Sequence, residues 1–295
     1  VRYGRWVMPN AVADDGVKLY YEEAGEGTPI LFIHEFADDL RTWEPQFNYF
    51  SRNYRCIAYN ARGYPPSEVP ESSDYYSQLR AAQDARDVLK HLGIEKAHII
   101  GLSMGGFASL HFGLNFSEMA HSLVVAGCGY GAGGDRDQWR KETGEIAQRF
   151  VDQGMESVSQ FYAYGPTRVQ LENKDPRGFA AFVSRFNEHS PLGCANTFIG
   201  VQGERPSLYD LQDEMRKLTV PTYIMTGDED EPCLDPNLMM KRTIPTSWLA
   251  VLPNAGHAIN LEDPELFNGL IQRFLTAVDT GTFKARDPRS IGQSM

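Results

Sequence analysis

The sequence predicts an α/β protein built around a mostly parallel sheet. Six short apolar runs recur along the 295 residues, and segments of helical periodicity lie between them. Nearly continuous apolar runs are typical of strands that are buried on both faces, as in parallel sheets covered by helices. Alternation of such strands with helices is the pattern of an α/β fold. The runs are 29–34, 54–59, 97–102, 122–126, 222–226 and 248–252.

The elements between and before these runs follow the same rhythm. Residues 16–22 alternate between apolar and polar side chains, which predicts a more exposed strand ahead of the first run. Helical periodicity predicts core helices at 79–92, 105–115 and 264–278.

One long interval contains no strand-like run. Between 129 and 218 the helical patterns cover 136–152, 155–163, 176–188 and 206–217. We interpret this interval as a helical insertion between two core strands. The predicted domains are therefore a discontinuous core at 1–128 and 219–278, a helical cap at 129–218, and a mobile polar C-terminal extension at 279–295.

Charge and composition exclude several classes of partner. The chain carries 39 acidic and 28 basic residues, a formal net charge of −11. Nucleic acid and anionic membrane surfaces favour basic proteins, so we expect neither as a partner. No apolar run approaches the roughly 18–20 residues of a membrane helix. A small-molecule substrate is the expected partner, and a homo-oligomer is compatible with the sequence.

The four cysteines are widely spaced and form no C-x-x-C pair. A chain of this length can build its core without disulfides, so we expect reduced thiols and a cytoplasmic location. The first ten residues contain no apolar segment typical of a signal peptide.

The segment 101–105 carries the most specific motif, G-x-S-x-G. An apolar run precedes it and a helical pattern follows it, which is the context of a nucleophile elbow. In such a turn Ser103 is held in a strained conformation with its hydroxyl exposed, and a Cβ at Gly101 or Gly105 would crowd the turn. The backbone N–H of Met104, at the start of the helix, is then placed to stabilise a developing oxyanion.

A serine nucleophile needs a base, and the best candidate is His257. It follows the last apolar run in Asn-Ala-Gly-His, so it lies at the carboxyl ends of the strands, where sites of α/β sheets gather. Of the other histidines, some fall in predicted strands or helices, and the rest do not follow the last apolar run. The seven are His34, His91, His98, His111, His121, His189 and His257.

The acid that orients the base is expected in the acidic turn 228–231, directly after the run 222–226. Asp230 is the preferred candidate because it lies further beyond the strand and can reach across to His257. Asp228 is the alternative, and it can instead cap the turn through backbone N–H groups.

These motifs in this order resemble the α/β-hydrolase superfamily over roughly 11–278, and within it the group with a helical cap. The resemblance rests on Ile33-His34, the segment 59–67 (YNARGYPPS), the elbow, Gly-Asp-Glu-Asp at 227–230, and Gly256-His257. It implies an eight-stranded, mostly parallel sheet, supports Asp230 as the acid, and implies that Arg62 bridges loops beneath the site.

The resemblance also implies that the backbone N–H groups of Phe36 and Met104 form the oxyanion hole. Here the chain departs from its relatives, because Glu35 replaces their usual Gly. Glu35 is either strained at positive φ, or tolerated with a local hydrogen bond, or functional through substrate, water or Arg62.

The expected activity is that of a serine hydrolase acting on a small, neutral carboxylic ester, with no metal and no organic cofactor. The same triad could cleave carbon–carbon bonds, lactones or amides, and some relatives use the pocket as a receptor. The acidic residues near the site favour a neutral substrate, unless Arg62 or one of the cap arginines turns inward. Examples of such cap arginines are Arg168, Arg177 and Arg185.

Overall fold

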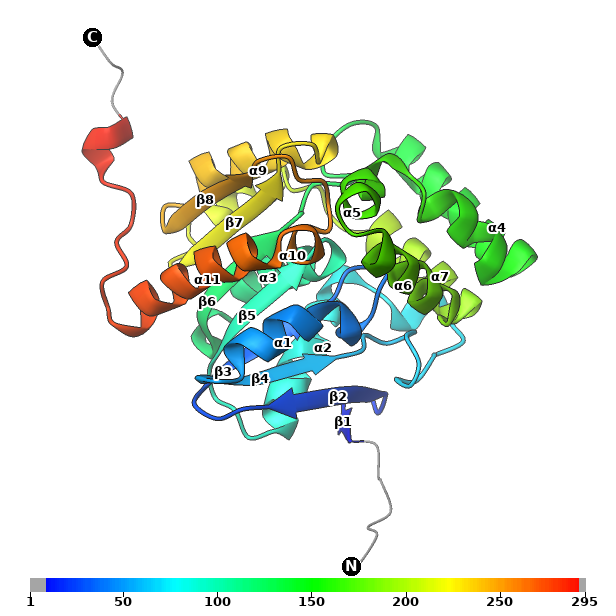
Figure 1. The fold of residues 1–295 in the computed structure, drawn as a ribbon, viewed down its shortest axis with the longest axis horizontal. Helices are drawn as coiled ribbons and strands as arrows, with labels where there is room; N and C mark the ends of the chain where they lie inside the picture. Colours follow the sequence, from blue (N-terminus) through cyan, green and yellow to red (C-terminus); the bar gives the residue numbers. More distant parts are fainter. Residues whose placement is uncertain (1–8, 292–295) are drawn as a thin grey trace, which may run out of the picture.

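The computed structural model of the chain describes residues 9–291 and is centred on one eight-stranded sheet (Figure 1). The strand order is β1-β2-β4-β3-β5-β6-β7-β8. The pairs β1–β2 and β2–β4 are antiparallel, and all other neighbours are parallel. The strands are β1 (Asn10–Val12), β2 (Lys18–Ala24), β3 (Thr28–Ile33), β4 (Tyr54–Tyr59), β5 (Ala97–Leu102), β6 (Ala120–Ala126), β7 (Thr222–Gly227) and β8 (Ser247–Leu252).

Helices cover both faces of the sheet, because successive strand residues point to opposite sides and both sides are apolar. Helices α2 (Gln78–His91), α3 (Met104–Asn115) and α9 (Glu231–Thr243) pack on one face. Helices α1 (Glu44–Phe50) and α11 (Pro264–Asp279) pack on the other. The predicted α/β fold, with a mostly parallel sheet flanked by helices, is confirmed.

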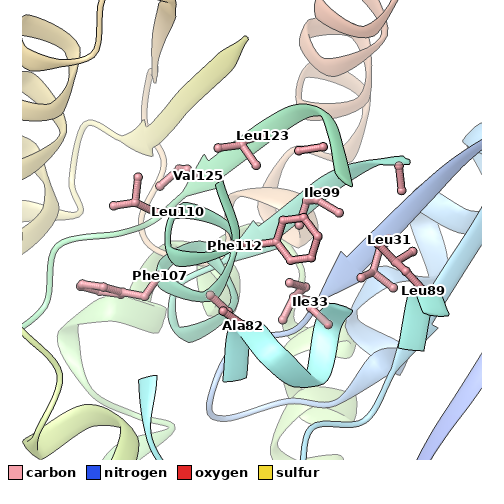
Figure 2. Packing of buried hydrophobic residues seen from close by; sticks show 14 of the residues in the cluster. Leu31, Ile33, Ala82, Leu89, Ile99, Phe107, Leu110, Phe112, Leu123 and Val125 are labelled. Carbon is pink, nitrogen blue, oxygen red and sulfur yellow. The ribbon is translucent and has the colours of Figure 1, made fainter. Parts of the chain in front are cut away.

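Figure 2 shows how α2 and α3 meet the sheet. Side chains of β3, β5 and β6 contact the aromatic and aliphatic side chains of α3, and Phe112 lies at the centre of this group. The labelled residues are Leu31, Ile33, Ala82, Leu89, Ile99, Phe107, Leu110, Phe112, Leu123 and Val125. This packing fixes α3, and with it the turn that precedes α3.

The chain between β6 and β7 contains helices and no strand within the described residues. Figure 1 shows α4 to α7 gathered at the end of the sheet toward which the parallel strands point. The predicted pair 136–152 and 155–163 forms α4 (Arg136–Tyr162), which Gly154 interrupts with φ 73° and ψ 178°. The other elements are η4 (Pro166–Arg168), α5 (Val169–Lys174), α6 (Pro176–Asn187), α7 (Pro191–Asn196), the π-helix η5 (Thr197–Gly203) and α8 (Gln212–Met215).

Several local features differ from the prediction, and the core helices α1 and α9 are not among the predicted elements. Strand β1 has only three residues, too few to show a period, and was not expected. The expected helix 206–217 contains only α8, because the preceding segment forms turns. The first part of the predicted extension is packed: Asp279 accepts hydrogen bonds from Tyr54 and His98, and Phe283 contacts Trp248. Residues 292–295 of that extension lie outside the described part.

All four cysteines are free and buried. Within the described residues, every helix is either too short or too polar to cross a lipid bilayer.

Candidate active site

The turn between β5 and α3 presents Ser103 in a strained conformation. Ser103 has φ 55° and ψ −116°, and Asn254 is the only other described non-glycine residue at positive φ. Such a conformation costs about 1–3 kcal/mol and persists only where the surroundings enforce it. A Cβ on Gly101 would lie 1.9 Å from the carbonyl oxygen of Gly105. The two glycines therefore permit the turn, as the motif predicts.

Gly105 also lets a second loop approach the nucleophile turn. A Cβ at this position would lie 2.0 Å from the carbonyl oxygen of Ile33 and 2.8 Å from that of His34. The end of β3 is thus in contact with the start of α3. This approach brings the loop that contains Phe36 beside Met104, the first residue of α3.

His257 and Asp230 meet at the carboxyl ends of two neighbouring strands. Asp230 follows β7 and His257 follows β8, and Nδ1 of His257 lies 2.7 Å from Oδ2 of Asp230. Both side chains are buried. Burial by itself raises the pKa of Asp230, but the charge and hydrogen bond of His257 outweigh it, so the pKa lies below its usual range. The ionised carboxylate therefore fixes Nδ1 as the donor and leaves Nε2 free to accept a proton.

Asp228 serves another partner. Its carboxylate is exposed and accepts a hydrogen bond of 3.0 Å from the backbone N–H of Ala255. It caps the loop that carries His257, and the hydrogen bond to the imidazole comes from Asp230. Of the two alternatives for the acid, the geometry thus brings Asp230 to the histidine.

Ser103 and His257 line the same cavity of about 270 Å³. Its other walls come from the helical segment, where five aromatic side chains stand beside polar and charged ones, among them Glu142. The lining side chains include those of Tyr130, Trp139, Thr143, Phe161, Tyr162, Arg168, Phe198 and Gln202. The volume fits a small organic molecule, close to the lower end of typical ligand pockets.

The loop after β3 is held by a chain of hydrogen bonds. Nδ1 of His34 donates to the carbonyl oxygen of Glu35 at 2.6 Å, and Nε2 accepts from the backbone N–H of Ala61 at 3.0 Å. Burial lowers the pKa of His34, so the neutral tautomer that these contacts require is favoured. The hydroxyl of Tyr64 donates to the carbonyl oxygen of Phe36 at 2.9 Å.

Glu35 is neither strained at positive φ nor paired with Arg62. Among the described residues its backbone φ is not positive, and its carboxylate forms an ion pair with Arg168 of η4. Both side chains are buried, at 1% and 2% exposure. Arg62 instead bridges loops, as the resemblance implied, with Nε 2.7 Å from Asp84 and Nη1 2.8 Å from the carbonyl oxygen of Tyr75.

Two further acids of this loop also pair with the helical segment. Oδ2 of Asp38 lies 2.6 Å from Nη2 of Arg185, and Oδ2 of Asp39 lies 3.5 Å from Nε2 of His189. The Asp38 and Asp39 side chains are buried. The loop 35–39 is therefore attached to the helical segment by two ion pairs and by the contact of Asp39 with the His189 ring. In the sequence the cluster of acids is visible, but its basic partners lie 133 or more positions away, and no pattern shows which of them it contacts.

Replacing Glu35 with glutamine is expected to lower the free energy of unfolding by about 3–5 kcal/mol, because it leaves the Arg168 charge buried without its partner. Urea denaturation at pH 7 measures the change. The matched control is Glu145→Gln, at an exposed position of α4. A Glu35→Gln variant as stable as this control would contradict the buried ion pair.

Replacing Asp39 with asparagine tests the electrostatic contribution of the same loop. Burial raises the pKa of Asp39, but the nearby ring of His189 and the hydrogen bonds and charge of Arg41 outweigh it and hold the pKa well below its usual range. This stabilisation is present above the unfolded-state pKa of about 3.9 and is lost as the pH falls below it. At pH 7 we expect Asp39→Asn to cost about 1.5–3 kcal/mol.

The difference in the free energy of unfolding between wild type and Asp39→Asn should shrink as the pH falls from 5 to 3. Urea denaturation at both pH values measures this difference. The control is Asp74→Asn at an exposed site, expected to change the free energy of unfolding by less than about 0.5 kcal/mol. A gap that stays constant down to pH 3 would refute this role of the Asp39 carboxylate.

One group of potential metal ligands overlaps the site. An oxygen of Asp230, the sulfur of Cys233 and a ring nitrogen of His257 lie within 4.8 Å of one another. Burial raises the pKa of the Cys233 thiol well above its usual range, and the thiolate is the form that binds metals. The Asp230 and His257 atoms are already joined by their hydrogen bond. The donor set thus fits an acid–base pair better than a metal centre.

Comparisons with known proteins agree with this fold. A sequence model described as "alpha/beta hydrolase fold" matches residues 28–264. The 2-hydroxy-6-oxo-6-phenylhexa-2,4-dienoate hydrolase of Burkholderia cepacia is 23% identical over 92% of this chain and 96% of that protein. The 3-oxoadipate enol-lactonase 1 of Acinetobacter baylyi is 23% identical over 84% of this chain and 89% of that protein.

A solved structure shows the same likeness. The thermophilic esterase of Thermogutta terrifontis superposes with a TM-score of 0.82 and 25% identity, over 92% of this chain and 98% of that one. Because the alpha/beta hydrolase model matches residues 28–264, most of the chain, and the sheet order agrees with it, the chain belongs to the α/β-hydrolase family.

Proposed function

We propose that this protein is a serine hydrolase that cleaves small, neutral carboxylic esters through an acyl-enzyme intermediate. The observation that carries the proposal is the 2.7 Å contact of His257 with Asp230, in a cavity that also contains the strained Ser103. A base oriented by a carboxylate beside an exposed serine is the arrangement that activates a hydroxyl nucleophile.

In the proposed reaction His257 takes the proton of Ser103 as the hydroxyl oxygen attacks the ester carbonyl. The backbone N–H groups of Phe36 and Met104 stabilise the oxyanion, helped by the N-terminus of α3. His257 then donates the proton to the leaving alcohol. Water activated by His257 cleaves the acyl-enzyme and releases the acid.

The preference for a small, neutral substrate is supported by the cavity. Its volume is about 270 Å³. Arg168 does turn inward, but Glu35 neutralises it, so no net positive charge is offered to an anionic substrate. We also infer that the segment 129–218 is a cap, since it supplies most of the cavity wall.

The test of the proposed function is covalent labelling. A fluorophosphonate probe is expected to react with the folded protein and to be found on the peptide containing Ser103 by mass spectrometry. Ser103→Ala is expected to remain unlabelled under the same conditions. A folded wild-type protein that resists the probe would favour a small-molecule receptor over an enzyme.

A second candidate reaction is the hydrolysis of a carbon–carbon bond in a ring-fission product. It is favoured by the similarity to the 2-hydroxy-6-oxo-6-phenylhexa-2,4-dienoate hydrolase of Burkholderia cepacia and by the aromatic side chains that line the cavity. The two candidates are separated by a substrate panel. Turnover of short alkyl esters with no action on vinylogous 1,5-diketones supports the esterase, and the reverse result supports the alternative.

A further inference from the structure

The cavity that holds Ser103 and His257 contains two buried donors without protein acceptors. Gln202 is 7% exposed, and its Nε2 has no hydrogen-bond partner among residues 9–291. Arg168 is 2% exposed, and its Nε and Nη1 also lack partners within the described chain. Both side chains line the cavity. A buried donor left unsatisfied costs about 1–3 kcal/mol, so donors at a cavity wall point to an acceptor that a ligand brings.

The backbone around Gln202 is held firmly by α4. Gln202 belongs to the π-helix η5, and its carbonyl oxygen accepts a hydrogen bond of 2.8 Å from Nε1 of Trp139. A Cβ at the next residue, Gly203, would lie 2.9 Å from Oγ1 of Thr143. π-Helical turns are rare and occur frequently at functional sites. The amide is thus presented to the cavity by a fixed backbone.

The charges around the cavity determine which acceptor fits. The Nη2 group of Arg168 is paired with Glu35, and Asp230 lies behind His257 as a second carboxylate. Among the described residues that line the cavity, Arg168 is the one arginine or lysine, and it is already paired with Glu35. A substrate carboxylate would therefore add a negative charge without a free cation in the lining to balance it. An uncharged carbonyl oxygen accepts from the same donors without that penalty.

We propose that Gln202, together with Arg168, binds a second, uncharged carbonyl oxygen of the substrate, so that the preferred substrates are oxo-substituted esters. This inference rests on the proposed esterase function and names its substrate class. Trp139, Tyr162 and Phe198 line the cavity, and their aromatic side chains contact the apolar remainder of the substrate. Gln202 is then a specificity-determining residue on the cap side of the cavity.

The experiment compares wild type with Gln202→Met on matched esters. Ethyl 4-oxopentanoate and ethyl 4-methylpentanoate differ by an oxygen in place of a methyl group in the acyl part. Acetonyl acetate and isobutyl acetate make the same comparison in the alcohol part. Because each substrate is compared between the two proteins, its intrinsic reactivity cancels.

Gln202→Met is expected to lower kcat/KM about 10-fold for the oxo ester of one pair, the loss of one hydrogen bond. The methyl ester of that pair should change less than about 3-fold, and Gln148→Met, at an exposed site on α4, should change neither. Wild type should also prefer ethyl 4-oxopentanoate to monoethyl succinate, which carries a carboxylate instead.

Three results would overturn the inference. The first is an equal loss of kcat/KM in Gln202→Met for both members of each pair, accompanied by a lowered Tm. The second is an unchanged kcat/KM of Gln202→Met for every oxo ester. The third is a wild-type preference for monoethyl succinate over ethyl 4-oxopentanoate. If Ser103→Ala retained wild-type turnover of these esters, the proposed function would fail and this inference with it. Turnover that depends on Ser103 but ignores Gln202 would remove this inference alone.

Discussion

Ser103→Ala is expected to lower kcat for the best ester substrate by about 10⁶-fold, the size of effect seen when a triad serine is removed. The strained turn holds the hydroxyl in the cavity beside His257, and alanine has no atom that can form the acyl-enzyme. A residual acceleration of about 10³-fold over water is expected from the oxyanion hole and substrate binding. Stopped-flow and steady-state ester hydrolysis measure both values.

The control for this variant is Ser157→Ala, an exposed serine of α4, which should keep wild-type kcat. Thermal unfolding should show that Ser103→Ala is as stable as wild type, since the change removes one oxygen and no packing. Wild-type kcat in the folded Ser103→Ala protein would eliminate the acyl-enzyme mechanism.

Asp230→Asn is expected to lower kcat by about 10⁴-fold while the protein stays folded. The carboxylate accepts from Nδ1 of His257, whereas an amide can offer its NH₂ group and stabilise the opposite tautomer. Nε2 then carries the proton and cannot take one from Ser103. In addition, the imidazolium that forms during the reaction loses its counter-charge.

Asp228→Asn is the matched control, because it makes the same chemical change two residues away. Its carboxylate is exposed and contacts the backbone of Ala255, so we expect a change in kcat of less than about 3-fold. Ester hydrolysis by the two purified variants measures the difference. A large loss in Asp228→Asn with little loss in Asp230→Asn would reverse the assignment of the acid.

Much of the fold could be predicted because its signals are local. The six apolar runs match β3 to β8 within two residues, since buried parallel strands are apolar throughout their length. The elbow could be identified from Gly101, Ser103 and Gly105 alone. Only glycine fits at position 101, because a Cβ there would lie 1.9 Å from the carbonyl oxygen of Gly105. Ser103, Asp230 and His257 could be placed at one edge of the sheet because each follows a predicted strand.

The roles of these three residues stay predictions that the variants test. Their placement is already consistent with the order of elements, because parallel neighbours end at one edge of the sheet and bring residues after β5, β7 and β8 together.

The contacts of the helical segment could not be predicted in this way. Glu35 and Arg168 are 133 residues apart, and Asp38 and Arg185 are 147 apart. Arg185 and Arg177 carry the same charge on one helix, yet Arg185 reaches Asp38 and Arg177 is exposed. No periodicity distinguishes them, because the choice depends on which face of α6 packs against the core.

The chain's local chemistry thus determines the sheet, the elbow and the residue types at the site. Only the packed structure decides that Arg168 is neutralised by Glu35 and that Gln202 faces the cavity. Strand runs and tight turns are set by interactions between near neighbours, which a linear sequence displays. The shape and charge of the cavity arise from the docking of distant helices, where desolvation and pairing are properties of the assembled fold.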